Sequence, residues 1–436
     1  MKRSSAHPTS VADALRLCFP TLAVLATLSC TLPALAVTSC DPHGFGAKAD
    51  GMTKDTIAIQ KAIDACAAQG GGTVTLMAGT YLSAPIVLKS NVTLHLDKGA
   101  TLMGSPDHAD YPAKTEFRAP GLQSLISANG ASNIAITGEG TVDGNGATWW
   151  TMARAIKDTG ILGSDHPRPR LVVLEHCKHV LLEGVTFENS PMWQIVPYYS
   201  DDVVIRNVRV LAPQHAPNTD AIDPFSSTNV LIDHVFADVG DDDIAIKSGA
   251  INSPGPDAPS ANITIRDCTF LHGHGVSVGS ELAGGAQNIL VERVTMDGTD
   301  NGIRVKANRD RGNDVSRIVF RDMQIKNVKY GLIISEYYPK VFPQPGEKAQ
   351  PVGRLTPHFH DITVENVTIT HAKIAGAIIG LPEVPMPGIV LKNVSISAQK
   401  GMVIGYAQVA AKDFHVVAQD GPGITQTTGA KLTSTH

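Results

Sequence analysis

The chain is poor in aromatic side chains, in cysteine and in helical periodicity. Only 5% of its 436 residues are aromatic and six are cysteine, whereas 40 are glycine and 43% are hydrophobic. This composition excludes a disordered chain, because enough apolar residues are present to form a large core. It favours a solenoid with many turns and small side chains over an aromatic-rich β-sandwich.

Positive charge is not in excess either. The formal net charge is −5, and it becomes −7 once residues 1–36 are removed, because that segment carries three basic residues and one acidic residue. No strong basic field then remains to neutralise phosphates. We therefore expect no nucleic-acid partner.

Residues 1–36 are predicted to be a secretory signal peptide. Basic residues precede an apolar run over 17–35, and Ala34-Leu35-Ala36 has the form of a cleavage site. Two prolines interrupt the run, which argues against a transmembrane anchor. We expect a secreted or periplasmic protein that does not associate with a membrane after cleavage, acts as a monomer and has one domain over 37–436.

Four cysteines follow the predicted cleavage site. In an oxidising compartment we expect a Cys40–Cys66 disulfide that ties the mature N-terminus to the first helix. The sequence leaves open whether Cys177 and Cys268 are bridged or are buried thiols. No pair has the spacing of a zinc site, and we expect no metal and no cofactor.

A single amphipathic helix is predicted over 55–68, ahead of many short strands. Ile57, Ile59, Ile63 and Cys66 are predicted to share its buried face. A helix in this position would cap the open end of a stacked core, where apolar side chains and strand edges would otherwise be exposed.

An apolar triplet followed by a charged or polar turn recurs through the rest of the chain. The first residues of these triplets are Val180, Val203, Val230, Ile263, Ile289, Ile318, Ile362 and Ile389. They are 23 to 44 residues apart, which indicates a constant coil with loops of different length. The hairpins of a β-sandwich would not preserve this order of strand, turn and second strand. We therefore predict an all-β fold, a single right-handed parallel β-helix.

Three long segments interrupt the repeat, over 104–126, 150–170 and 339–358. In a solenoid such insertions lie on the outside and often form the walls of a binding groove. The final residues, 425–436, are polar and are expected to be frayed.

Each repeat also contains a second short strand, which aligns on one apolar residue. The aligned residues are Ile222, Ile244, Val276, Ile303 and Leu332, and two residues before each lie Asp220, Asp242, His274, Asn301 and Tyr330. If the strands stack in register, these polar side chains form a column with rungs about 4.8 Å apart. Asp241 lies beside the column, and Lys247, Arg304 and Lys306 provide a positive border.

This arrangement suits glycoside hydrolysis. One carboxylic acid must protonate the leaving oxygen, and a carboxylate must activate water or attack the anomeric carbon. When several carboxylates lie close together, repulsion between their negative charges raises the proton affinity of at least one carboxylate. Asp and Asn also cap turns in β-helices, so we interpret Asp233, Asp297 and Asp322 as structural. A calcium site is the other interpretation of the cluster, because calcium also binds carboxylate oxygens.

Four motifs in this region resemble the signature motifs of polygalacturonases, glycoside hydrolase family 28, in their usual order. They are Asn218-Thr219-Asp220, Gly240-Asp241-Asp242, Gly273-His274-Gly275 and Arg304-Val305-Lys306. The similarity extends from Phe45-Gly46-Ala47 through Asp143-Gly144 and Trp149-Trp150 to Ser335-Glu336-Tyr337-Tyr338, and so covers nearly all of the mature chain.

The resemblance implies a right-handed β-helix, inversion at the anomeric carbon and no metal. It makes Asp241 the general acid, and Asp220 and Asp242 the pair that activates water. His274 then supports the ionisation state of the acid. The resemblance also assigns substrate binding to Asn218, Arg304, Lys306 and Tyr338, with the basic pair gripping the galacturonate carboxylate. Asp243 departs from the family pattern, in which Cys often follows the two acids.

The leading hypothesis is a secreted pectinase that hydrolyses α-1,4 bonds in polygalacturonate. An exo-acting form and a rhamnogalacturonan hydrolase are alternatives with the same chemistry, and the sequence does not choose between endo and exo action. A calcium-dependent pectate lyase and a non-catalytic carbohydrate-binding β-helix are the alternatives from other classes. Two adjacent Asp residues together with His and a basic pair favour acid–base hydrolysis over both.

Overall fold

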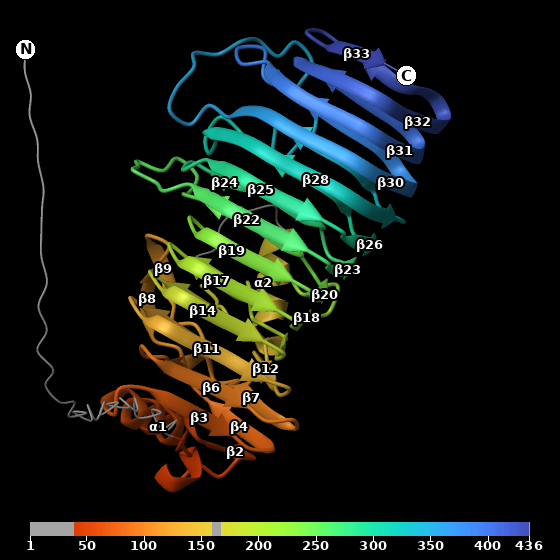
Figure 1. Cartoon of the computed structure of the whole chain (residues 1–436). Coiled ribbons are helices and arrows are strands. Elements are labelled where there is room, and N and C mark those ends of the chain that lie inside the picture. Colours follow the sequence, from red (N-terminus) through yellow and green to blue (C-terminus); the bar gives the residue numbers. More distant parts are fainter. Residues whose placement is uncertain (1–38, 159–166, 436) are drawn as a thin grey trace, which may run out of the picture. The chain divides into compact units, whose positions relative to one another are not determined.

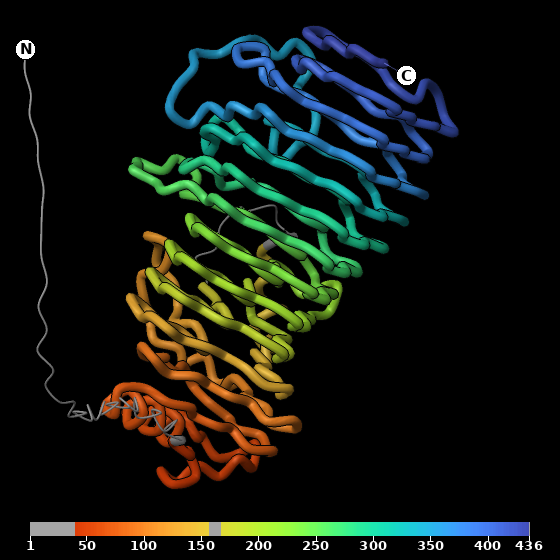
Figure 2. Tube along the Cα trace, viewed as in Figure 1, coloured from red at the N-terminus to blue at the C-terminus, as the bar shows by residue number. Residues whose placement is uncertain are grey.

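The computed structural model describes residues 39–158 and 167–435, so the predicted signal peptide lies outside the described residues. Within these residues the chain coils through three parallel ladders of strands. Successive coils stack from the N-terminal helix to the last strand (Figure 1), and the trace shows the same stack as repeated turns (Figure 2). The predicted parallel β-helix is therefore confirmed.

One ladder, which we call the site face, carries the strands that hold the predicted polar column. Its strands are β5 (Ile86–Val87), β10 (Ile126–Asn129), β13 (Val172–Glu175), β16 (Ile195–Tyr198), β21 (Ile244–Ser248), β24 (Val276–Leu282), β27 (Asn301–Lys306) and β29 (Tyr330–Ser335). Between β16 and β21 the ladder continues through single bridges at Ile222 and Phe225.

The other two ladders close the coil. The second face contains β1 (Ser39–Cys40), β3 (Gly72–Leu76), β6 (Val92–Leu96), β11 (Ser132–Gly138), β14 (Lys178–Glu183), β17 (Asp201–Arg206), β19 (Thr228–Asp233), β22 (Ser260–Arg266), β25 (Ala286–Glu292), β28 (Asp314–Lys326), β30 (His358–Ile379), β31 (Met386–Gly405), β32 (Ala407–Gln426) and β33 (Lys431–Thr435). The third face contains β2 (Asp50–Lys54), β4 (Gly79–Ser83), β7 (Ala100–Gly104), β12 (Thr141–Asp143), β15 (Thr186–Glu188), β18 (Arg209–Leu211), β20 (Phe236–Val239), β23 (Thr269–His272) and β26 (Thr295–Asp297), and it merges into β28.

The predicted apolar triplets occupy one register on the second face. Each first residue is the direct partner of the next, in the order Val180, Val203, Val230, Ile263, Ile289, Ile318, Ile362 and Ile389. Alternate residues point inward and are buried in one continuous core of Ile, Val and Leu. Burial of each such side chain contributes roughly 1.5–3 kcal/mol, which fixes the register from coil to coil.

The N-terminal cap is helix α1 (Thr56–Ala68), which follows the short 3-10 helix η1 (Pro42–Phe45). Ile59, Ile63 and Cys66 are buried as predicted, but Ile57 is 70% exposed, so its predicted burial was wrong. Residues two apart are 200° apart around a helix, and Ala58 fills the buried face instead. The predicted Cys40–Cys66 disulfide is present, with 6.0 Å between its Cα atoms.

Cys177 and Cys268 are buried free thiols, which answers the question that the sequence left open. Burial raises the pKa of both. Among the described residues, no helix has both the length and the apolar character needed to cross a membrane.

Parts of the long segments are more ordered than the sequence indicated. The segment over 150–170 begins inside helix α2 (Ala147–Asp158), and 104–126 contains the 3-10 helix η2 (His108–Asp110) and an antiparallel hairpin of β8 (Ala113–Glu116) and β9 (Ala119–Leu122). The expected fraying after residue 425 is also wrong, because β33 pairs with β32 and adds a last rung.

Candidate active site

The site face confirms the alignment of the second strands. Ile222, Ile244, Val276, Ile303 and Leu332 are register partners from each coil to the next. The side chains two residues earlier therefore belong to neighbouring coils.

Three of these five side chains, Asp220, Asp242 and His274, line a cavity of about 450 Å³ on the site face, whereas Asn301 and Tyr330 do not. All eight predicted site residues line it: Asn218, Asp220, Asp241, Asp242, His274, Arg304, Lys306 and Tyr338. Further residues complete the wall, among them Arg168, Trp193, Lys247 and Glu281, while Ala153 and Ile156 of α2 border it. The cavity thus brings together four carboxylates, those of the three Asp residues and of Glu281, and several cations.

Asp242 lies at the centre of the positive charge. Lys306 Nζ donates to its Oδ2 over 2.9 Å, while Arg304 and Ser277 donate to its Oδ1. Burial alone would raise the pKa of Asp242, but Arg304 and Lys306 together lower it below the usual range. Asp242 is therefore a fixed anion at working pH.

Asp241 is paired with a histidine from the next coil. His274 Nδ1 lies 2.9 Å from Asp241 Oδ1, and the backbone N–H of His274 donates to the carbonyl of Asp241 over 2.8 Å. Burial would lower the pKa of His274, but the charge of Asp241 outweighs it and raises this pKa. The imidazole therefore holds a proton next to Asp241 over a wider pH range than a free histidine would.

Asp220 is buried, and one of its carboxylate oxygens is unpaired in the described part of the chain. Its Oδ2 lies 3.6 Å from Lys247 Nζ, while its Oδ1 is buried without a hydrogen-bond partner among the described residues. Burial, together with the charges of Asp223 and Asp241, raises the pKa of Asp220. Buried polar atoms normally have a partner, so this oxygen is a natural acceptor for a buried water.

Asp223 is an acid that the sequence analysis missed. It is fully buried one residue after Ile222, and neither carboxylate oxygen has a hydrogen-bond partner among the described residues. Burial raises its pKa to about 8, although the charge of Lys247 opposes the shift. Its position between Ile222 and Pro224 was the available signal, because an acid inside an apolar run has to be neutralised or paired.

The raised pKa of Asp223 predicts how stability depends on pH. The folded chain retains this proton up to about pH 8, whereas the unfolded chain loses it near pH ~4. The folded state binds the extra proton across this window, so the free energy of unfolding falls as pH rises through it. We expect the Tm of Asp223→Asn to fall less than that of the wild type between about pH 5 and pH 8. Thermal unfolding at both pH values measures this, and parallel declines would contradict it.

Lys247 contacts acids from two sides of the cavity. Its Nζ lies 3.6 Å from Glu281 as well as from Asp220, and 4.9 Å from the centre of the Trp193 ring. Burial would lower the pKa of Lys247, but Asp223 and Glu281 raise it. Trp193 lies two residues before Ile195, the register partner of Ile222, so it extends the predicted column by one coil.

The two adjacent tyrosines have different surroundings. Tyr338 lines the cavity, with Lys306 Nζ 5.1 Å from the centre of its ring. Tyr337 is buried in a separate apolar cluster and does not line the cavity. Asn218 also lies at the wall, where its Oδ1 accepts a hydrogen bond from Arg168 Nη2 over 2.8 Å.

Asp243 points away from the acids of the cavity. Its Oδ2 accepts a hydrogen bond from the backbone N–H of Gly275 over 2.9 Å, and burial raises its pKa. This residue therefore supports the turn that carries His274. The interpretation of Asp233, Asp297 and Asp322 as structural agrees with their contacts, because each side chain pairs with a residue of the following coil on the outer surface.

The ion pairs between the acids and the basic residues of the cavity argue against a calcium site. Asp242 is already neutralised by Arg304 and Lys306, and Asp220 faces Lys247. A divalent cation would have to bind next to these fixed positive charges. The geometry therefore favours acid–base chemistry.

Comparison with known proteins identifies the family. The family model described as glycosyl hydrolases family 28 matches residues 66–412. The chain belongs to this family. It is 31% identical over 388 residues to a probable polygalacturonase of Vitis vinifera, with 82% of this chain and 75% of that protein covered. It is 32% identical over 338 residues to an endo-polygalacturonase of Pectobacterium carotovorum, with 74% and 79% covered.

Among solved structures, the chain is similar to a hyperthermoactive exopolygalacturonase from Thermotoga maritima. The two share 28% sequence identity with a TM-score of 0.75, covering 86% of this chain and 91% of that one. This likeness confirms the predicted right-handed parallel β-helix. As a member of glycosyl hydrolases family 28, the chain is a glycoside hydrolase.

Proposed function

We propose that this glycoside hydrolase is a secreted polygalacturonase that hydrolyses α-1,4-galacturonosyl bonds in pectin. The observation that carries this proposal is the cavity in which Asp220, Asp241 and Asp242 meet Arg304 and Lys306. Three carboxylates supply the acid and the base of the reaction, and the cations suit a substrate whose sugar units are acidic. The polygalacturonases among its relatives support the same substrate.

Each acid has an environment that fits a separate role. Asp241, next to the proton-holding His274, donates a proton to the leaving oxygen. Asp220 and Asp242, which both line the cavity, form the pair that activates the attacking water, and Asp242, held ionised by Arg304 and Lys306, accepts its proton. Water attacks on the face opposite the leaving group, so the anomeric configuration inverts.

The basic residues also select the substrate. Arg304 and Lys306 bind the carboxylate of a galacturonate unit while they hold Asp242, and Asn218 and Tyr338 form the neighbouring wall. A neutral sugar would leave part of this positive charge uncompensated in a partly buried site.

One end of the site face is covered, which supports exo action. Phe117, at the tip of the β8–β9 hairpin, stacks on Phe225 at 5.4 Å between ring centres and meets Tyr198 edge-on at 4.6 Å. Phe225 lies on the coil that carries Asp220, and Tyr198, on β16, is its bridge partner one coil earlier. A polymer that runs along the site face would collide with this tip. We therefore propose that the enzyme releases short products from a chain end.

The backbone at the hairpin tip is in a strained, left-handed conformation. Phe117 and Arg118 both have positive φ, at 50° and 63°, where a two-residue hairpin normally has Asn-Gly. Each such residue costs on the order of 1 kcal/mol. Arg118 is retained there by hydrogen bonds to Asp257 Oδ1 over 2.9 Å and to the Tyr199 hydroxyl over 3.1 Å.

Chromatography of the early products from polygalacturonate tests exo action. We expect monomer or dimer alone from the wild type. The double variant Phe117→Asn/Arg118→Gly preserves the turn but removes the covering side chains, so longer oligomers should be released early. Lys114→Gln on the same hairpin is the matched control and should retain the wild-type profile. Mixed oligomers from the wild type would refute exo action while leaving the hydrolase assignment intact.

A further inference from the structure

A second cluster of ligand-type side chains lies outside the cavity, where β30 begins. His358 and His360 both point outward from this strand, because the intervening Phe359 is fully buried. Asp314 of β28 is the register partner of His358. The three side chains therefore project from two adjacent coils onto one patch of surface, although 44 residues separate Asp314 from His358 in the sequence.

The ligand atoms of this cluster already converge. His360 Nε2 lies 2.8 Å and His358 Nδ1 lies 3.8 Å from Asp314 Oδ1. One ligand atom from each of the three residues lies within 4.8 Å of the other two. Ligands of a tetrahedral zinc ion are about 3.3 Å apart when each is about 2.0 Å from the metal. Small side-chain rotations would bring these atoms to that spacing.

A further carboxylate orients one of the imidazoles. His360 Nδ1 lies 2.8 Å from Asp361 Oδ2, so Nε2 is the nitrogen that faces Asp314. Metal-binding histidines commonly donate their other ring N–H to a carboxylate, which fixes the tautomer and raises the basicity of the ligand. Ser316 Oγ donates a hydrogen bond to Asp314 Oδ2 over 3.0 Å, so the other carboxylate oxygen, Oδ1, faces the histidines.

The other clusters of this kind among the described residues are already neutralised by arginine or lysine. Asp233 and Asp267, which flank His234, pair with Arg266 and Arg293 at 3.0 and 2.8 Å. The Asp241–Asp242–His274 cluster contains the Arg304 and Lys306 pairs described above. Asp314, by contrast, has ion pairs only with histidines among the described residues.

We propose that Asp314, His358 and His360 form a binding site for a divalent transition-metal ion of the zinc type. Two imidazoles and one carboxylate suit zinc, and water completes the coordination. Magnesium and calcium bind there poorly, because they prefer sites made of oxygen ligands.

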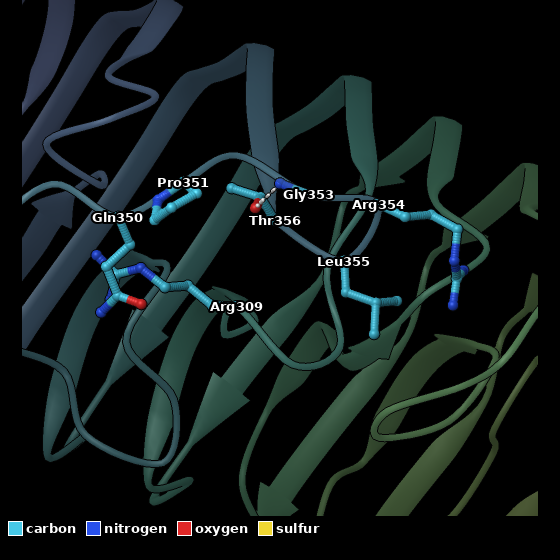
Figure 3. Close-up of a pocket in the computed structure, with 7 residues that line it drawn as sticks. All are labelled: Arg309, Gln350, Pro351, Gly353, Arg354, Leu355 and Thr356. Carbon is cyan, nitrogen blue, oxygen red and sulfur yellow. Dashed lines mark hydrogen bonds between the residues drawn. The ribbon is translucent and has the colours of Figure 1, made fainter.

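The metal stabilises the end of the long segment that precedes β30. The backbone already connects this segment to the neighbouring coil, through hydrogen bonds from Gly312 N to Leu355 O over 2.9 Å and from His358 N to Asn313 O over 3.0 Å. The same segment lines a pocket of about 400 Å³, where Arg309 and Arg354 extend to opposite sides (Figure 3). A metal bound by Asp314, His358 and His360 would hold the end of this segment against the start of β28 on the neighbouring coil.

Titration of the protein, purified without a histidine tag, with zinc sulfate tests the site. Calorimetry should show one zinc bound per chain, and zinc at a hundredfold excess over its dissociation constant should raise the Tm by about 3 °C. Magnesium chloride should leave the Tm unchanged. The zinc-dependent rise should be lost in Asp314→Asn and in His360→Gln. Hydrolysis by both variants should remain at the wild-type rate, since neither residue lines the cavity.

A single exposed histidine–carboxylate pair provides the matched control. His179 Nδ1 lies 2.7 Å from Asp202 Oδ2, and no third ligand joins this pair within the part of the chain that the structure describes. His179→Gln should therefore retain the full zinc effect. The proposal is overturned if the wild type binds no zinc, or if Asp314→Asn binds it as well as the wild type does. The Tm of each variant without zinc shows that a lost effect does not reflect unfolding.

Discussion

Asp241→Asn is expected to reduce hydrolysis of polygalacturonate by at least about a hundredfold while leaving the fold intact. Asn cannot donate the proton that the leaving oxygen requires. The side-chain oxygen of the Asn can still accept a hydrogen bond from His274 Nδ1, so the local geometry is preserved. Initial rates of reducing-end release measure the loss, and an unchanged Tm verifies folding.

Asp300→Asn is the matched control for this variant. Asp300 also contacts His274, at 3.7 Å from Nε2, but its side chain is 57% exposed and does not line the cavity. The same chemical change should therefore leave the rate close to that of the wild type. An Asp241→Asn enzyme with near wild-type activity would disprove the assignment of the acid.

Asp242→Asn is expected to damage both catalysis and stability. The rate should fall on the order of a hundredfold, because the fixed anion that accepts the proton of the water is lost. Arg304 and Lys306 would also lose their buried counter-charge, which costs about 3 kcal/mol or more of unfolding free energy. Kinetics together with denaturant unfolding measure the two effects separately.

Asp243→Asn, the same substitution at the adjacent residue, is the matched control for Asp242→Asn. Asp243 is buried like Asp242, but it accepts a hydrogen bond from the backbone N–H of Gly275, and burial raises its pKa, which favours the neutral acid. Asn resembles a neutral carboxylic acid, so Asp243→Asn should lose little activity. Equal losses in both variants would show that the effect of Asp242→Asn arises from general damage to the turn.

The strand repeat made much of this fold predictable. Val203 and Val230 stack in register because a slip of one residue would turn every apolar side chain of the strand outward. The same constraint placed Asp220 and Asp242 on neighbouring coils. The column could therefore be predicted once the apolar residues had been aligned.

Features that depend on loop direction were not predictable. Phe117 reaches Phe225 only because the hairpin folds over the site face, and 108 residues separate the two in the sequence. Asp314 and His358 likewise meet across a segment whose length conceals the coil repeat. The apolar run around Asp223 signalled a buried acid, but its proximity to Lys247 and Asp242 arises only when neighbouring coils stack.

The products that the wild-type protein releases from polygalacturonate in the presence of a chelator distinguish hydrolysis from the lyase and binding alternatives. We expect new reducing ends, saturated products without ultraviolet absorbance, and loss of this activity in Asp241→Asn. Unsaturated products that require calcium, or binding of polygalacturonate without release of reducing ends, would contradict it.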